Sequence, residues 1–190
     1  MLAYIFWHAP FAGADPRAYD AALLAFQADL AAAPPPGLTS CTTYRIAAVP
    51  WLGDRPGYED WYVVSSFAAL EALNDAAINA RRAPIHAAVA SKMETGHGGL
   101  YRHFLGEFFG EAQAGSGRIA WVRRPRGIEY QQPLQEIVTS ATGFASCWRR
   151  QMVLGPAEEF AIVGSSQLEL SVPPGWAVRI VERTALAAGG

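Results

Sequence analysis

Apolar and polar positions in the first half of the chain predict strands and helices in the order βαββαβ. Residues 3–9 form a short apolar run, which predicts a buried strand. Asp15 and Pro16 follow as an N-cap residue and a first helical residue. The helix that begins there carries apolar side chains on one face, at Tyr19, Leu23, Phe26 and Leu30. The other elements predicted for this half are strands at 38–49, 58–65 and 100–108, a loop at 50–57, a helix that begins after Ser66, and a helix at 83–93 that the glycine-rich run 96–99 ends.

The second half of the chain repeats this order in a shorter form. Residues 143–147 match residues 37–41 as Gly-x-x-Ser-Cys, and each stretch follows a predicted helix and opens a predicted strand. Two serines end the third strand of each half, at 65–66 and at 165–166. The short stretch 167–175 contains two prolines, so most of the second helix is predicted to be missing here. The elements predicted for this half are strands at 118–122, 158–165 and 176–184, a strand that opens at 143–147, and a helix at 129–141.

The predicted fold is therefore α+β, with two ferredoxin-like halves whose antiparallel sheets form a pseudo-dimeric α/β barrel. The first half covers residues 1–109, a small polar linker covers 110–117, and the shortened second half covers 118–190. Helices on one face of each sheet leave the other face apolar, and packing the two sheets together buries it. We expect the better-formed pocket in the first half, because the insert at 81–93 provides a cover for it.

Composition and charge narrow the classes of function. The chain is 51% hydrophobic, which is enough for a substantial core. Its 15 basic and 17 acidic residues give no basic field, so no nucleic-acid partner is expected. No apolar run approaches the roughly 20 residues that cross a bilayer, so no membrane span is expected. Cys41 and Cys147 have no second Cys or His at ligand spacing, which predicts neither a metal site nor a disulfide and favours a cytoplasmic location.

The segment YEDWYVVSSFAALEAL, residues 58–73, resembles the strand-to-helix passage of the dimeric α/β-barrel superfamily. That superfamily includes cofactor-independent antibiotic-biosynthesis monooxygenases, EthD-like proteins, stress-responsive barrels and the tandem-repeat haem proteins related to chlorite dismutase. The resemblance implies an antiparallel barrel with a cavity for a small molecule. Monooxygenase members often carry a tryptophan at the end of this strand and a histidine in the next helix, where this chain has Ser65–Ser66 and Asn74–Asp75.

Candidate ligand-binding residues lie on predicted strands of the first half. His8 and His103 carry imidazoles, which move protons near neutral pH. Arg45 carries a permanent charge suited to a carboxylate or an enolate-like anion, and Trp61 offers a flat wall for an aromatic ligand. An apolar pocket needs a few convergent polar groups, so we expect at least one of Arg45, Trp61 and His103 to face the cavity. The alternative for Arg45 is a position on the protein surface, and the alternative for Trp61 is packing in the core.

Two functions remain open from the sequence. The first is an enzyme, a cofactor-independent, monooxygenase-like oxidoreductase acting on a small apolar or aromatic compound; the second is a non-catalytic ligand-binding or oligomerising protein, with assembly into homo-oligomers. A haem-binding protein of the chlorite dismutase-like type is a further alternative, although no cofactor is predicted and no proximal histidine motif is found. Motifs for a nucleophile elbow, a phosphate-binding loop and a dinucleotide site are absent from the sequence, which removes those classes. No catalytic residue is assigned.

Overall fold

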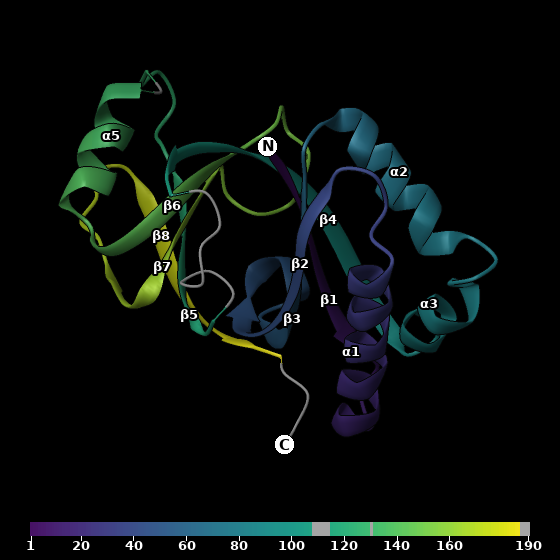
Figure 1. Ribbon diagram of the computed structural model, residues 1–190. Coiled ribbons are helices and arrows are strands. Elements are labelled where there is room, and N and C mark those ends of the chain that lie inside the picture. Colours follow the sequence, from purple (N-terminus) through teal and green to yellow (C-terminus); the bar gives the residue numbers. More distant parts are fainter. Residues whose placement is uncertain (108–114, 130, 187–190) are drawn as a thin grey trace.

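A closed barrel of eight strands, with helices outside it, makes up the part of the chain that the computed structural model describes, residues 1–107, 115–129 and 131–186 (Figure 1). Its elements are β1 (Leu2–Pro10), α1 (Pro16–Ala32), β2 (Leu38–Val49), a short 3₁₀ helix (Pro50–Leu52), β3 (Arg55–Val64), α2 (Phe67–Ile78), α3 (Ala83–Ala90), β4 (Met93–Gly106), β5 (Gly117–Arg123), α5 (Gln131–Ser140), β6 (Thr142–Arg150), β7 (Phe160–Glu169) and β8 (Ala177–Ala185). The predicted linker at 110–117 lies mostly outside the described residues, and the domain boundaries based on it stay predictions.

The strands neighbour one another in the order β1-β3-β2-β8-β5-β7-β6-β4, and β4 returns to β1. The first half contributes β4-β1-β3-β2 and the second half β8-β5-β7-β6, which is the ferredoxin-like order in both cases. Antiparallel pairing of β2 with β8 and of β4 with β6 joins the two sheets at both edges. The predicted fold class is confirmed, and the barrel leaves no free edge strand.

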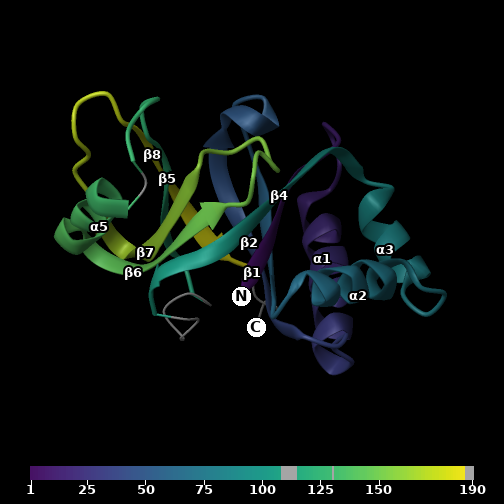
Figure 2. The same ribbon diagram turned by 90° about the horizontal axis from the view of Figure 1, so that it is seen from above.

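Local signals in the sequence place the helices of the first half. The Asp15 side chain accepts from the backbone N–H of Arg17 at 3.0 Å and caps α1, whose apolar face is buried as predicted. Ser66 accepts from the backbone N–H of Ala69 at 3.1 Å and caps α2. In Figures 1 and 2, α1, α2 and α3 lie on one side of the barrel and α5 lies on the opposite side. Each half thus keeps its own helices outside its own sheet.

The two Gly-x-x-Ser-Cys stretches occupy matching places in the two halves. Gly37 and Gly143 both have positive φ, +80° and +67°, which favours glycine. A Cβ on Gly37 would lie 2.7 Å from Ser65 Oγ, and a Cβ on Gly143 would lie 2.6 Å from Ser165 Oγ. In each half, therefore, the glycine at the start of the second strand packs against a serine of the third-strand segment, which follows β3 in the first half and lies within β7 in the second. This shared contact supports the predicted duplication.

The glycine-rich run 96–99 does not end a helix, and this sequence prediction is wrong. Helix α3 already ends at Ala90, and the glycines belong to strand β4. A Cβ on Gly98 would lie 2.5 Å from the Tyr4 hydroxyl oxygen, and a Cβ on Gly96 would lie 2.7 Å from the Phe6 ring. The glycines therefore leave room for two aromatic rings of the neighbouring strand β1, a reason that only the strand pairing reveals.

The second half differs from the first after its third strand. Strand β7 does not end at Ser165–Ser166, as predicted, but continues to Glu169. Residues 170–176 then lead into β8 without a helix, which confirms that the second half has lost this element. Its sheet is covered instead by α5, through a buried cluster that includes Leu134, Ile137 and Leu168.

The barrel interior is filled by large side chains. Trp7 and Trp121 lie on strands that are not neighbours, yet their ring centroids are 5.3 Å apart. Glu59 is fully buried beside them and accepts from the indole N–H groups of Trp7 and Trp61 at 2.8 and 2.7 Å. Burial raises the pKa of Glu59, and the guanidinium of Arg183, 3.5 Å away, opposes that rise. This packed interior is a core rather than a ligand cavity.

Candidate active site

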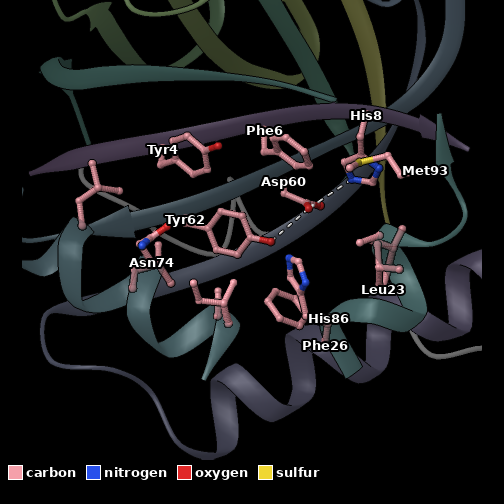
Figure 3. Close-up of a pocket in the computed structure, with 16 residues that line it drawn as sticks. Tyr4, Phe6, His8, Leu23, Phe26, Asp60, Tyr62, Asn74, His86 and Met93 are labelled. Carbon is pink, nitrogen blue, oxygen red and sulfur yellow. Dashed lines mark hydrogen bonds and ion pairs between the residues drawn. The ribbon is translucent and has the colours of Figure 1, made fainter. Parts of the chain in front are cut away.

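A cavity of about 510 Å³ lies outside the barrel, between the sheet of the first half and its helices (Figure 3). The insert at 81–93 forms part of its lining, as the sequence predicts for a cover over the first-half pocket. The cavity is lined by Tyr4, Phe6, His8, Leu23, Phe26, Asp60, Tyr62, Leu70, Leu73, Asn74, Ala77, Ile78, His86, Val89, Ala90 and Met93. All of these residues belong to the first half, and most are apolar or aromatic.

Strand periodicity explains how β1 lines the cavity. Tyr4, Phe6 and His8 alternate with Ile5 and Trp7, which point into the barrel interior. The Phe6 ring lies 6.3 Å from the Tyr4 ring and 5.2 Å from the His8 ring, both in stacked orientations. One face of β1 is therefore an aromatic wall of the cavity, and the other face is barrel core.

A buried carboxylate stands in the middle of this wall. Asp60 on β3 is 3% exposed, and its Oδ2 accepts from the Tyr62 hydroxyl at 3.1 Å and lies 3.2 Å from His8 Nε2 (Figure 3). Its Oδ1 accepts from the Thr43 hydroxyl at 2.6 Å. Three side chains thus satisfy the carboxylate that burial deprives of water.

His8 connects this cluster to helix α1. The ring is fully buried, and its Nδ1 lies 2.7 Å from the Tyr19 hydroxyl. When neutral His8 donates from Nε2 to Asp60, Nδ1 is an acceptor for the Tyr19 hydroxyl, so both ring nitrogens are satisfied. The Tyr58 ring stacks on the imidazole with 5.4 Å between centroids. Position and tautomer of His8 are therefore set by the surrounding side chains.

The phenols next to the carboxylate stay protonated. Burial raises the pKa of Tyr62 well above its usual value, and the charge of Asp60 raises it further. Burial and the same carboxylate also raise the pKa of Tyr4. Tyr62 is accordingly a hydrogen-bond donor to Asp60 over the physiological pH range.

The helix side of the cavity contributes His86 from α3 and Asn74 from α2 (Figure 3). The His86 ring is half-buried and lies 6.0 Å from the Phe26 ring, edge-on. Within the described part of the chain, no side chain or backbone group hydrogen-bonds to the His86 ring. An imidazole that faces Asp60 across the cavity is thus available to a ligand.

Comparison with known proteins places this geometry in a fold. No model of a known protein family matches the sequence, and no curated protein matches it. An anthrone oxidase-like protein of known structure is similar with a TM-score of 0.50 and 12% identity, over 96% of this chain and 72% of that chain. A protein from Lactobacillus acidophilus NCFM, provisionally described as a monooxygenase, is similar with a TM-score of 0.55 and 10% identity, over 98% of this chain and 94% of that chain. The chain has the dimeric α/β-barrel fold. At these identities the similarity concerns the fold alone.

The second half of this dimeric α/β barrel lacks the polar set. Strand pairing matches Cys41 opposite Tyr62 with Cys147 opposite Ile162, so Tyr62 and Ile162 are equivalent. By the same register, Phe160 stands where the first half has Asp60. A second hollow lies near α5 and β6, but none of its described lining residues carries an ionisable side chain. Of the two halves, the first therefore holds the candidate chemistry.

The sequence-predicted site residues are dispersed in the dimeric α/β barrel. His8 lines the cavity, but Arg45 is half-exposed on β2 and pairs with Asp20 of α1. Trp61 points into the barrel and donates to a buried carboxylate, and the His103 ring packs edge-on at 5.1 Å from a barrel tryptophan. Arg45, Trp61 and His103 do not line this cavity, and their role as ligand contacts stays a prediction without a pocket to support it.

Sequence reasoning did not include Asp60, Tyr62 or His86 among the candidate ligand-binding residues, although all three line the cavity. Asp60 and Tyr62 alternate with Trp61 along β3, and the charged pair Glu59–Asp60 directly before an apolar run is itself a signal of buried polar groups. The sequence around His86 gives no comparable signal. Its helix α3 packs on α1, but none of the residues of α3 is fully buried, so no buried polar position stands out.

The described residues contain neither a candidate metal cluster nor a helix suited to span a membrane. No group of three or more His, Cys, Asp or Glu side chains there could hold a metal ion. None of the described helices is long and apolar enough to cross a membrane.

Proposed function

We propose that this chain binds a small aromatic compound in the cavity between β1, β3 and helices α1–α3, and oxidises it with molecular oxygen. The observation that carries the proposal is the buried Asp60–His8 pair in the wall of an otherwise apolar, aromatic cavity. An apolar pocket with a few convergent polar groups is the usual form of a small-molecule site. Ionisable groups inside such a pocket are candidates for proton transfer.

The proposed reaction needs no bound cofactor, because the substrate supplies the electrons. Asp60, held in place by His8, accepts a proton from a CH₂ group that is acidified by conjugation with an aromatic ketone, which leaves an electron-rich enolate. The enolate carbon then reacts with O₂. One oxygen atom becomes a new carbonyl, the other leaves as water with the two hydrogens of the CH₂ group, and the carbon is oxidised as O₂ is reduced. His86, on the opposite wall, would hydrogen-bond the carbonyl oxygen of the substrate.

Oxygen uptake with anthrone as the probe tests this proposal. Anthrone has the required CH₂ group beside an aromatic ketone system, and its oxidation should consume one O₂ per anthraquinone formed, above the rate without protein. Asp60→Asn should lower the protein-dependent rate about 100-fold, as loss of a general base does. Asp54→Asn makes the same chemical change at an exposed residue that precedes β3, outside the cavity lining, and should leave the rate unchanged. Equal rates with and without protein would contradict the enzymatic proposal.

A non-catalytic binding protein is the second candidate, and the occupied nitrogens of His8 favour it. Because Tyr19 and Asp60 already engage both ring nitrogens, the imidazole is held as a structural group. Anthrone binding measured by calorimetry, without protein-dependent oxygen uptake, would favour this function over oxidation. The absorption spectrum of the purified protein tests the haem alternative, since bound haem gives a Soret band.

A further inference from the structure

The cavity is lined by one carboxylate and by no permanently positive side chain. Among its lining residues, Asp60 is the carboxylate and His8 and His86 are the titratable bases, but no lysine or arginine is present. His8 is already engaged by Asp60 and Tyr19. The cavity therefore offers a ligand no permanent positive charge.

Two arginines of this half have their partners outside the cavity. Arg45 pairs with Asp20 on the outer surface of α1 and β2. Arg82 is buried, and its guanidinium donates to the Asp29 carboxylate at 2.5 Å and to backbone carbonyls around the end of α1. Moving either guanidinium to the cavity would break a pair and leave a carboxylate without its partner.

An anionic ligand is thus at a disadvantage in this cavity. It would lose its hydration among aromatic and aliphatic side chains without gaining a counter-charge. It would also approach the carboxylate of Asp60, and like charges in a low-dielectric site repel strongly. A neutral hydroxyl, carbonyl or amide group meets neither penalty and can hydrogen-bond to Asn74 or His86.

We propose that the cavity accepts neutral aromatic compounds and rejects aromatic carboxylates, and that Asp60 determines this selectivity. The inference rests on the proposed function of the cavity as an aromatic-binding site. In this proposal the site selects its ligands by their charge.

Calorimetric titration with 2-naphthamide and 2-naphthoate at pH 7.5 tests the inference. The two probes have nearly the same shape, and at this pH the carboxylate is ionised. We expect the amide to bind at least about tenfold more tightly to the natural chain, the factor expected for a modest charge penalty. Asp60→Asn should reduce the preference to about threefold or less, because it removes the repelling charge. Asp54→Asn, an exposed residue that precedes β3 and lies outside the cavity lining, should keep the full preference.

A second variant carries the test if Asp60→Asn does not fold. Ile78 lines the cavity at its rim and is 59% exposed, so Ile78→Arg introduces a guanidinium without disturbing the core. It should raise the affinity for 2-naphthoate about tenfold and leave that for 2-naphthamide unchanged. Equal binding of both probes to the natural chain, or a full preference kept by folded Asp60→Asn, would overturn the inference alone. Failure of both probes to bind would overturn the proposed aromatic-binding function as well.

Discussion

At the scale of single residues, the wall of the cavity depends on one carboxylate and the side chains that satisfy it. Asp60 combines charge with nearly complete burial, and it is held by Thr43, Tyr62 and His8. Buried polar groups of this kind are stable only when their partners are in place, because each lost hydrogen bond leaves a desolvated group behind. Tyr19 belongs to the same network through His8, although it lies on a helix rather than on the sheet.

Tyr19→Phe tests this network with the loss of one oxygen atom. The change leaves His8 Nδ1 without its partner in a buried site, so the free energy of unfolding should fall by about 1–2 kcal/mol. Urea denaturation measures this quantity, and calorimetry with 2-naphthamide should show weaker binding. Tyr101→Phe is the matched control, since its hydroxyl donates at 2.8 Å to the Glu158 carbonyl away from the cavity. An equal effect of both variants on ligand binding would contradict a role for Tyr19 in positioning His8.

At the scale of elements, the cavity exists because α2 and α3 are fixed to the end of α1. Arg82, in the turn between α2 and α3, is 3% exposed and donates to the carbonyls of Ala76, Asp29 and Ala33 as well as to the Asp29 carboxylate. Its neighbour Arg81 binds the same carboxylate at 2.7 Å but is largely exposed. The two arginines thus differ in burial and in the number of groups they join.

Arg82→Met should loosen the cover of the cavity, and Arg81→Met should not. Removing the buried guanidinium removes its hydrogen bonds to Asp29 Oδ2 and to three backbone carbonyls, so we expect a loss of about 3 kcal/mol in the free energy of unfolding. The exposed pair of Arg81 should contribute less than about 1 kcal/mol. Urea denaturation gives both values, and affinity for 2-naphthamide should fall in Arg82→Met only. Similar losses in the two variants would show that burial does not distinguish them.

At the scale of the whole molecule, two halves with the same strand order have taken different roles. The interior of the closed barrel is packed with tryptophans and a buried Glu59–Arg183 pair, and the candidate cavity lies outside the barrel, under the helices. In the first half that space is a cavity with polar groups, and in the second half the corresponding sheet positions are apolar and packed under α5. The buried tyrosines are Tyr19, Tyr44, Tyr58, Tyr62 and Tyr101.

Alkaline titration tests this burial of tyrosines. Burial and the hydrogen bond to Asp20 raise the pKa of Tyr58 to about 12, and burial raises the pKa of Tyr19, Tyr62 and Tyr101 further. In the unfolded chain the phenols ionise near pH 10, so above that pH the unfolded chain binds fewer protons than the folded one. Stability is thus fully present below pH 10 and falls as the pH rises further.

Tyrosinate absorbance at 295 nm, which phenolate formation increases, should rise at a higher pH in the folded chain than in the chain unfolded by guanidinium. Urea denaturation should give a lower free energy of unfolding at pH 10.5 than at pH 8, where the phenols are protonated in both states. Superimposable titration curves for the folded and unfolded chain would contradict the burial of these phenols.

The local sequence was sufficient for the element order and the fold class. Short segments of the sequence predicted several features that the structure confirms. These are the helix caps at Asp15 and Ser66, the apolar face of α1 and the matching places of the two Gly-x-x-Ser-Cys stretches. Local signals of this kind depend on backbone preferences and on side-chain spacing within one element, which the sequence contains in full. They also identified the first half as the one with a covered pocket.

Which side chains meet in that pocket was decided by the tertiary structure. Neighbouring strand residues point to opposite faces, so a register that the sequence does not specify places Asp60 in the cavity and Trp61 in the barrel core. The role of the glycines at 96–99 depends on rings of another strand, and the surface pairing of Arg45 depends on a helix 25 residues away. The sequence by itself determined the elements and their duplication. Long-range pairing alone determined the site, because contacts between distant segments form only when the barrel closes.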